Sequence, residues 1–429
     1  MMKLNYRRTF LVGLAFMAIS TFWQLYDNII PLILKNTFGL GDTLAGGIMA
    51  LDNIFALIML PFFGALSDRI DTPIGRRMPF ILFGTALTVV AMLFLPLSDK
   101  IGSLPMFMAA LFVTLFAIST YRSPAVALMP DITPPPLRSK ANAVINLMGA
   151  LGVVAALVSI RLLVPEGPHP NYLPVFAVIA GFMVLATVVL FLTIKEKKLT
   201  AEIKAGDPEP SAATEKSAAK GSSAGMTKPV RRSLIFLLSS VFLWFMAYNG
   251  VMTAFSKYAQ EVLGLAGGAF ANVLLVATVT AVISFIPVGL FASRLGRKRT
   301  ILFGIIVMFI AFVGGCFFKS YSPLMNILLG MVGLGWAAIN VNSYPMVVEM
   351  ADGANIGRFT GYYYTFSMAG QIVTPVLSGA FLEHIGYWTL FPYAAVFMLL
   401  AFCTMMMVKH GDHRPLLPED KLELLDVVD

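Results

Sequence analysis

Residues 64–84 read GALSDRIDTPIGRRMPFILFG and form a charged segment between two long apolar runs. A reduced copy, GLFASRLGRKRTILFG, stands at residues 289–304, again between two apolar runs. The two copies align Arg69 with Arg294 and lie about half the chain length apart. A charged turn that recurs in this way between hydrophobic runs indicates a membrane protein built from a duplicated half.

The composition agrees with a membrane protein. Of the 429 residues, 58% are hydrophobic and only 13% are charged, whereas soluble domains carry about 25% charged residues. Apolar runs of 18 or more residues are typical of transmembrane helices. Such runs lie near residues 9–35, 44–66, 78–98, 104–129, 140–163, 172–194, 233–256, 267–292, 300–318, 322–348, 358–382 and 387–408. We therefore predict an all-α membrane protein with twelve transmembrane helices.

The net charge of +8 follows from the predicted topology. With the N-terminus placed in the cytoplasm, most of the 31 Lys and Arg residues fall on cytoplasmic segments. This asymmetry is the positive-inside bias of membrane proteins. The basic excess therefore indicates a multi-pass cell-membrane protein with both termini cytoplasmic, and we expect no nucleic-acid partner.

A polar stretch separates the chain into two halves. Here Lys, Glu, Ala, Ser and Gly replace the hydrophobic residues, a composition that does not bury enough apolar surface to fold alone. We expect an N-terminal six-helix bundle (1–194), a cytoplasmic linker (195–232), a C-terminal six-helix bundle (233–408) and a cytoplasmic tail (409–429). The start of the linker is predicted to form a short amphipathic helix.

A second internal match supports the duplication. PAVALMPD at residues 124–131 aligns with PMVVEMAD at residues 345–352. Because both halves start on the same side of the membrane, the repeats are parallel and related by an axis along the membrane normal. Two pseudo-symmetric six-helix bundles related in this way are the construction of major facilitator transporters.

The charged segment carries a more specific resemblance. GxxSDR followed after five residues by GRRxPFI, within residues 64–81, resembles the loop signature of the major facilitator superfamily. Its spacing and the ALMPD at residues 127–131 are similar to the sucrose/proton symporter branch, close to the glycoside–pentoside–hexuronide:cation symporters. The resemblance implies transport by alternating access, without a cofactor, and a central cavity lined by helices one, four, seven and ten.

The chain departs from these relatives at two places. Sodium-using relatives carry paired carboxylates on helix two, where this sequence has Ala56 and Leu60, so sodium coupling is not expected. Plant-like sucrose carriers have an Arg directly before the Ala-Leu of helix four. Val126 takes that place here, and Arg122 lies one turn earlier on the same helix face.

Three ionisable side chains stand inside the predicted spans: Asp27, Asp52 and Arg122. Such residues are costly within a bilayer and mark functional sites by default. A nearby Arg, a solute or water can change the proton affinity of a carboxylate, so we predict that these three residues couple transport to protons. No histidine lies within a predicted span. The alternative for Asp52 is that it pins helix two to helix one by hydrogen bonds.

Amides and aromatic rings follow helix faces in several spans. Aromatic rings suit stacking on sugar faces, and amides suit hydrogen bonds to hydroxyl groups, so we predict a neutral, polyhydroxylated substrate. The alternative is that the aromatic residues only fill helix packing. The predicted substrate-binding residues are Trp23, Gln24, Asn28, Asn53, Trp244, Tyr248, Asn249, Trp336, Asn340, Tyr344, Tyr364 and Gln371.

The charges of the repeated segments are predicted to form a cytoplasmic gate, pairing when the halves close there and separating when they open. The predicted gate residues are Asp68, Arg69, Arg76, Arg77, Asp131, Arg138, Asp352 and Arg358. Exposed ion pairs contribute only about 0–1 kcal/mol, which biases a balanced equilibrium without holding the fold. The alternative is that these charges only set the topology.

The sequence therefore predicts a monomeric secondary transporter that takes up a sugar or glycoside with a proton. A proton-coupled drug or metabolite exporter of the same fold is one alternative, and a membrane sensor that does not transport is another. We expect no enzyme, because no nucleophile–base pair, metal-ligand spacing or phosphate loop is found in the sequence. No metal site is predicted.

Overall fold

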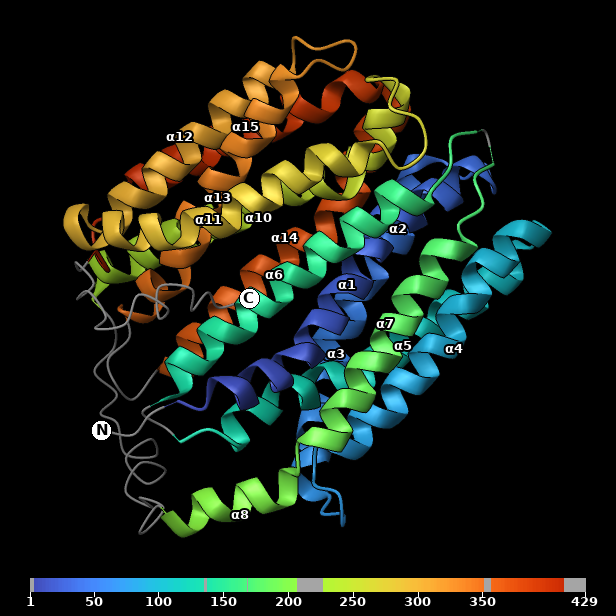
Figure 1. Cartoon of the computed structure of the whole chain (residues 1–429). Coiled ribbons are helices and arrows are strands. Elements are labelled where there is room, and N and C mark those ends of the chain that lie inside the picture. The colour runs from blue at the N-terminus through green and yellow to red at the C-terminus, as the bar shows by residue number, and fades with distance from the viewer. Residues whose placement is uncertain (1–3, 135–136, 168, 207–226, 351–355, 413–429) are drawn as a thin grey trace.

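The computed structural model describes residues 4–134, 137–167, 169–206, 227–350 and 356–412. Within these residues every regular element is a helix, and twelve helical spans are long and apolar enough to cross a membrane (Figure 1). The predicted all-α fold with twelve spans is therefore confirmed.

The first half contains seven helices, because its second span is divided. They are α1 (Tyr6–Asn36), α2 (Asp42–Met49), α3 (Leu51–Arg69), α4 (Met78–Ile101), α5 (Leu104–Asp131), α6 (Arg138–Leu163) and α7 (Leu173–Thr193). α1 packs against α6 and α7, while α5 packs against α3 and α4. These contacts bury the apolar side chains of one bundle.

The second half repeats this arrangement. It consists of α10 (Lys228–Glu261), α11 (Phe270–Leu295), α12 (Arg297–Gly315), α13 (Leu324–Val348), α14 (Ile356–His384), the short 3-10 helix η3 (Tyr387–Thr389) and α15 (Leu390–Met406). α13 packs against α11 and α12, and α10 packs against α14 and α15.

The second span is interrupted at Ala50, between α2 and α3. The two pieces face different neighbours, since α2 packs against α14 of the other half and α3 packs against α5 of its own half. The interruption places Asp52 in the first turn of α3. Sequence analysis predicted this span as one uninterrupted helix, and hydropathy gives no signal for the break.

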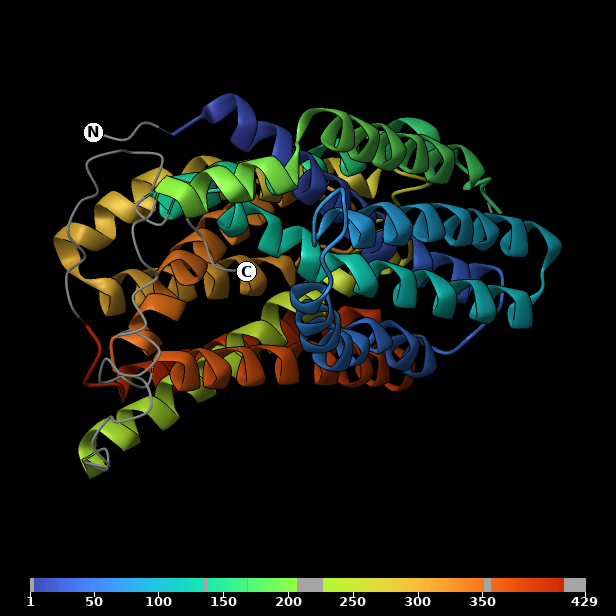
Figure 2. The same ribbon diagram turned by 90° about the horizontal axis from the view of Figure 1, so that it is seen from below.

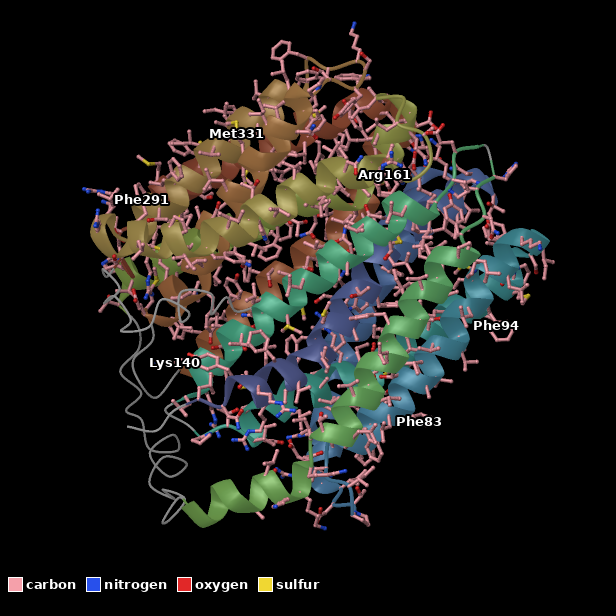
Figure 3. All side chains as sticks on the ribbon, viewed as in Figure 1. Phe83, Phe94, Lys140, Arg161, Phe291 and Met331 are labelled. Carbon is pink, nitrogen blue, oxygen red and sulfur yellow. The ribbon has the colours of Figure 1, made fainter. Side chains whose placement is uncertain are left out.

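The outer surface of the bundles is apolar. Phe83 and Phe94 project from α4 on the outside of the first half (Figure 3), and their side chains are 64% and 44% exposed. Many other large apolar side chains are also exposed, and large contiguous apolar patches are rare on soluble proteins. A lipid surrounding satisfies such a surface, because helices pair most of their backbone groups within themselves.

The two halves meet through α2 with α14, α6 with α11, and α1 with α10 (Figures 1 and 2). Glycines allow the closest of these approaches. A side chain at Gly46 would meet the carbonyl oxygen of Pro375, and one at Gly379 would meet the carbonyl oxygen of Asp42. Small residues at such crossings let helix backbones come close together in a membrane.

We call the end of the molecule that carries residues 70–77 and Gly296 the hairpin end, and the end that carries residues 37–41 and 262–269 the far end. Helix α8 (Glu196–Gly206) lies across the hairpin end of the first half (Figure 1). It corresponds to the predicted amphipathic helix at the start of the linker. The rest of the linker up to residue 226 and the tail from residue 413 lie outside the described residues.

Candidate functional site

A cavity of about 240 Å³ lies between the two halves. Helices α1 and α6 line it from the first half, and α10, α11 and α13 line it from the second. Its polar lining residues are Ser20, Gln24, Asn146, Tyr248, Thr278, Trp336 and Asn340. No charged side chain is among its lining residues. The arrangement suits a neutral solute with several hydrogen-bonding groups.

Two aromatic rings form one wall of this cavity. Tyr248 of α10 and Trp336 of α13 stack face to face, with ring centroids 3.7 Å apart and ring planes 5° from parallel. Phe245, one turn before Tyr248, meets Trp336 in a T-shaped contact at 5.3 Å. These contacts hold both cavity-lining rings in fixed orientations.

Asp27 of α1, Asp52 of α3 and Arg122 of α5 lie near enough to one another for electrostatic interaction. The charge of Asp27 interacts with the charges of Asp52 and Arg122. All three side chains are partly exposed, and none of them lines the cavity. No ion pair within 4 Å joins them in the described part of the chain. The cluster is therefore a set of neighbouring charges rather than a fixed salt bridge.

Local contacts position this cluster. The Oδ1 of Asp52 accepts hydrogen bonds from the backbone N–H and the side-chain amide of Asn53, at 2.6 and 2.7 Å. The guanidinium of Arg122 lies over the ring of Trp23, 5.4 Å from its centre. The Tyr26 hydroxyl donates to the carbonyl of Met49, which ties α1 to the end of α2.

Polar contacts join the two halves at the far end. Lys257 of α10 donates to Asp42 of α2 at 2.6 Å, and both side chains are less than a tenth exposed. The Tyr387 hydroxyl donates to the other oxygen of Asp42 at 2.5 Å. Lys35 of α1 pairs with Glu261 of α10 at 2.6 Å. We call these five residues the far-end network.

The hairpin end of the first half has a network of its own. Arg77 donates to Asp131 at 2.8 Å and also bonds Asp68 and Ser67. Burial lowers the pKa of the Arg77 guanidinium, but its bonds to Asp131 and Asp68 outweigh burial and leave the pKa above its ordinary value. Arg76 lies 3.6 Å from Asp131. All of these contacts stay within the first half.

A buried carboxylate fixes the backbone of this hairpin. Glu196, at the start of α8, accepts hydrogen bonds from the backbone N–H groups of Arg76, Arg77 and Met78 at 2.7 to 2.9 Å. A carboxylate at the start of a helix satisfies N–H groups that have no partner within the helix. The linker is thereby tied to the segment that precedes α4.

The second half carries a related arrangement at the hairpin end. Arg297 pairs with Glu349, and the backbone N–H of Lys298 donates to Asp412 at 2.9 Å. Gly296 has a positive φ and lies against the Asp412 carboxylate, just as Gly75 in the first half has a positive φ and lies against the Glu196 carboxylate. The predicted gate residue Asp352 lies outside the described residues. Sequence analysis did not single out Arg297 or Glu349.

Comparison with known proteins gives the family. The profile of the Major Facilitator Superfamily matches residues 12–286 and 272–424. The chain belongs to the Major Facilitator Superfamily. It is a multi-pass membrane transporter, which confirms the family prediction, and its relatives in this superfamily are transporters rather than enzymes.

The relatives of this transporter carry names that refer to different solutes. A segment of 27% of the chain is 30% identical to sucrose transport protein SUC3 of Arabidopsis thaliana and spans only 23% of that protein. Multidrug resistance protein MdtG of Escherichia fergusonii is 22% identical over 91% of this chain and 90% of its own. The solved nucleoside transporter NupG superimposes with a TM-score of 0.69 at 13% identity, covering 94% of this chain and 100% of that one.

Eight predicted substrate-binding residues of this transporter do not line the cavity: Trp23, Asn28, Asn53, Trp244, Asn249, Tyr344, Tyr364 and Gln371. Trp244 is fully buried in the core. The amide of Asn28 donates to the carbonyl of Gln24 on its own helix, and the hydroxyl of Tyr344 bonds Thr360. The other four predicted residues, Gln24, Tyr248, Trp336 and Asn340, do line it.

The remaining predicted gate residues lie at the surface. Arg69, Arg138 and Arg358 are exposed. Arg138 donates to the carbonyl of Thr133 at 3.3 Å, and Arg358 donates to the hydroxyl of Tyr362 at 2.6 Å. In this transporter the side chains of Arg138 and Arg358 bond within their own half.

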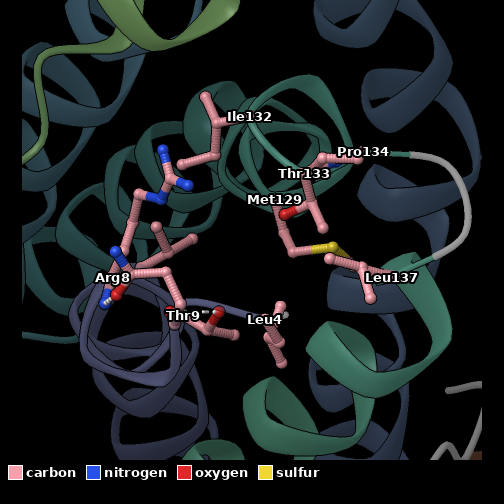
Figure 4. Close-up of a pocket in the computed structure, with 10 residues that line it drawn as sticks. Leu4, Arg8, Thr9, Met129, Ile132, Thr133, Pro134 and Leu137 are labelled. Carbon is pink, nitrogen blue, oxygen red and sulfur yellow. Dashed lines mark hydrogen bonds between the residues drawn. The ribbon is translucent and has the colours of Figure 1, made fainter. Parts of the chain in front are cut away.

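A second cavity, of about 190 Å³, lies at the hairpin end between the start of α1 and the end of α5. Figure 4 shows Arg8 and Thr9 on one side, with Met129, Ile132 and Leu137 among the apolar residues around it. It contains none of the predicted substrate or proton-coupling residues. We therefore place the candidate transport site in the central cavity.

Sequence analysis missed two groups of residues in this transporter. Asn146 and Thr278 line the cavity from α6 and α11, and polar residues within those apolar runs were the available signal. The far-end network was missed entirely. No sequence pattern pairs Asp42 with Lys257 or Lys35 with Glu261.

Proposed function

We propose that this transporter takes up a neutral sugar or glycoside together with a proton across the cell membrane. The single observation that carries the proposal is the composition of the central cavity. Gln24, Asn146 and Asn340 supply amides, Tyr248 and Trp336 supply rings, and no charged residue lines the wall. Amides pair with sugar hydroxyls, and the uncharged wall imposes no cost on a neutral solute.

The proposed proton site is the cluster of Asp27, Asp52 and Arg122. A charged side chain within a bilayer is retained where it serves a proton or solute pathway. The partial exposure of all three side chains supports access of water, and hence of protons, to this cluster. Asp27 is the proposed primary proton acceptor because it lies three residues after Gln24, which lines the cavity, on the helix that packs against α10 of the other half.

We further propose that the hairpin end faces the cytoplasm and that the central cavity is open toward it in this structure. The polar contacts that join the halves lie at the far end, whereas Arg77 and Arg297 pair inside their own halves. Transport then requires that the far-end network breaks while the hairpin charges form pairs across the halves. The likeness of a chain segment to a sucrose transport protein supports the choice of a sugar.

The test is uptake into liposomes that contain the purified transporter. Radiolabelled sucrose and a panel of glycosides are offered with an imposed pH gradient, acidic on the outside. We expect accumulation that is abolished by a protonophore and by Asp27→Asn. Absence of uptake for every member of the panel contradicts the substrate class.

A proton-coupled drug exporter is a second candidate. The match to multidrug resistance protein MdtG extends over 91% of this chain, and Phe16, Met252 and Phe285 supply an apolar part of the cavity wall. Efflux of lipophilic dyes from cells that express the transporter, without uptake of any glycoside, favours this candidate over the sugar symporter.

A further inference from the structure

The central cavity and the acidic cluster are separate places in this structure. None of the residues Asp27, Asp52 and Arg122 lines the cavity. A solute bound between Gln24 and Trp336 therefore does not touch the proposed proton acceptor directly. Coupling nevertheless requires that the free energy of solute binding depends on the protonation of Asp27. A residue that contacts both places has to carry this dependence.

Tyr248 lies next to both the cavity and Asp27. Its side chain lines the cavity together with Gln24 of α1. Asp27 lies three residues after Gln24 on the same helix, near enough to Tyr248 for an electrostatic interaction. Tyr248 belongs to α10 of the second half and Asp27 belongs to α1 of the first, and these helices pack together. The pair therefore spans the interface between the two halves.

The ring of Tyr248 is fixed by stacking, whereas its hydroxyl is available for a hydrogen bond. The ring stacks on Trp336 with centroids 3.7 Å apart, which fixes its plane. Among the described residues the hydroxyl has no hydrogen-bond partner. A phenol can donate one hydrogen bond and also accept one. The hydroxyl can therefore donate either to an ionised Asp27 or to a solute in the cavity.

Other groups around Asp27 do not supply the same link. The titratable groups that interact with it are Asp52 from α3, Arg122 from α5 and Tyr26 from α1 itself. None of these three lines the cavity. Helices α6 and α7 also pack against α1, and no titratable group from either of them is among the described interactions of Asp27.

We propose, on the premise that this transporter moves a neutral solute with a proton, that Tyr248 is the positioning residue that couples the two. When Asp27 is ionised, its carboxylate accepts a hydrogen bond from the hydroxyl of Tyr248. When Asp27 is protonated, the hydroxyl turns to donate to the solute. The proton therefore binds first and raises the affinity for the solute, and by reciprocity the solute raises the affinity for the proton.

The test compares Tyr248→Phe with the wild-type transporter. This substitution removes only the hydroxyl and keeps the ring that stacks on Trp336. The affinity for the solute is measured in liposomes as a function of pH, from the concentration dependence of solute counterflow, which needs no net proton movement. Tyr258→Phe is the matched control, because Tyr258 lies on the same helix outside the cavity and its hydroxyl donates a hydrogen bond to the carbonyl of Phe318.

We expect the wild type and Tyr258→Phe to bind the solute about 5–150-fold more tightly at low than at high pH, the usual range of coupling between two sites. Tyr248→Phe lacks the hydrogen bond to the solute and is expected to bind it at the weaker, high-pH level of the wild type at every pH, with less than a twofold change of affinity over the same range. Asp27→Asn leaves the hydroxyl to the solute and is expected to bind tightly at every pH, whereas the double variant is expected to bind weakly at every pH, because the two residues act on one step.

Two outcomes overturn the proposal. Wild-type pH dependence in Tyr248→Phe shows that coupling bypasses this hydroxyl. An affinity of Tyr248→Phe that stays at the tight, low-pH level of the wild type at every pH shows that the hydroxyl does not bond the solute. Failure of the proposed function is recognised separately, since the wild type then shows no pH-driven uptake at all.

Discussion

The two ends of this transporter use similar side chains in different ways. At the far end, Lys257 and Asp42 form a buried ion pair that joins the two halves. At the hairpin end, Arg77 and Asp131 form an ion pair of similar length within one half. The location of a pair relative to the interface therefore determines its role. A pair across the interface selects a conformation, whereas a pair inside one half stabilises that half in every conformation.

The largest effect is expected when one partner of the buried ion pair between the halves is removed. Lys257→Met leaves the Asp42 carboxylate buried without its cation, which costs about 3–5 kcal/mol. Since only the far-end-closed state bears this cost, the population is expected to shift toward an open far end by on the order of a hundredfold or more. Cysteine labelling of far-end positions by a membrane-impermeant maleimide measures the shift.

Two controls accompany Lys257→Met. Lys100→Met removes an exposed lysine at the same end and is expected to change nothing. Exchanging the charges, with Asp42→Lys and Lys257→Asp together, is expected to restore much of the closed population. An unchanged labelling pattern in Lys257→Met would show that this pair does not hold the far end closed.

The glycine contact between α2 and α14 provides a second test. Gly46→Val places a side chain against the carbonyl oxygen of Pro375 and is expected to favour separation of the halves at the far end, with a cost of about 1–3 kcal/mol for the closed state. Gly47→Val is the matched control, because a side chain there has nothing within 4 Å. Equal labelling of both variants contradicts a tight contact at Gly46.

The pairs inside the first half are expected to affect stability rather than conformation. Asp131 is 20% exposed and Asp68 is 58% exposed, although both bond Arg77. We expect Asp131→Asn to lower the free energy of unfolding by about 1–3 kcal/mol, as for a hydrogen bond to a charged group. Asp68→Asn is expected to lower it by at most about 1 kcal/mol. Thermal unfolding in detergent measures both effects, and a larger loss for Asp68→Asn would contradict this ranking.

The smallest effect is expected for the exposed pair of the far end. The side chains of Lys35 and Glu261 are 23% and 46% exposed, so their ion pair contributes about 0–1 kcal/mol. Glu261→Gln should therefore change far-end labelling no more than a few-fold, and high salt should mask the change. An effect as large as that of Lys257→Met would mean that burial is not what distinguishes the two pairs.

Much of the architecture was predictable because hydropathy and duplication leave strong signals. Asp27, Asp52 and Arg122 were predicted together because charges are rare inside apolar runs, and the structure brings all three into one cluster. Asp42 and Lys257 gave no such signal, since charges are ordinary at the ends of spans. Their pairing depends on how the two halves are placed against each other, which no local pattern encodes.

The tryptophans show the same limit for the cavity. Trp244 and Trp336 both stand inside apolar runs, and both were predicted to bind the substrate. Trp244 is fully buried in the core, whereas Trp336 lines the cavity. In a run that is apolar on every side, helical periodicity does not indicate which face meets the cavity.

The central claim is that the two ends open alternately, and distances between spin labels across each end test it most directly. On a background in which Cys316 and Cys403 are replaced by Ser, one pair of labels is placed at Glu166 and Lys319 of the far end. A second pair is placed at Ile74 and Arg299 of the hairpin end. All four positions are exposed. We predict that Lys257→Met lengthens the far-end distance and shortens the hairpin-end distance. Both distances lengthening together, or a far-end change without any hairpin-end change, would contradict alternation.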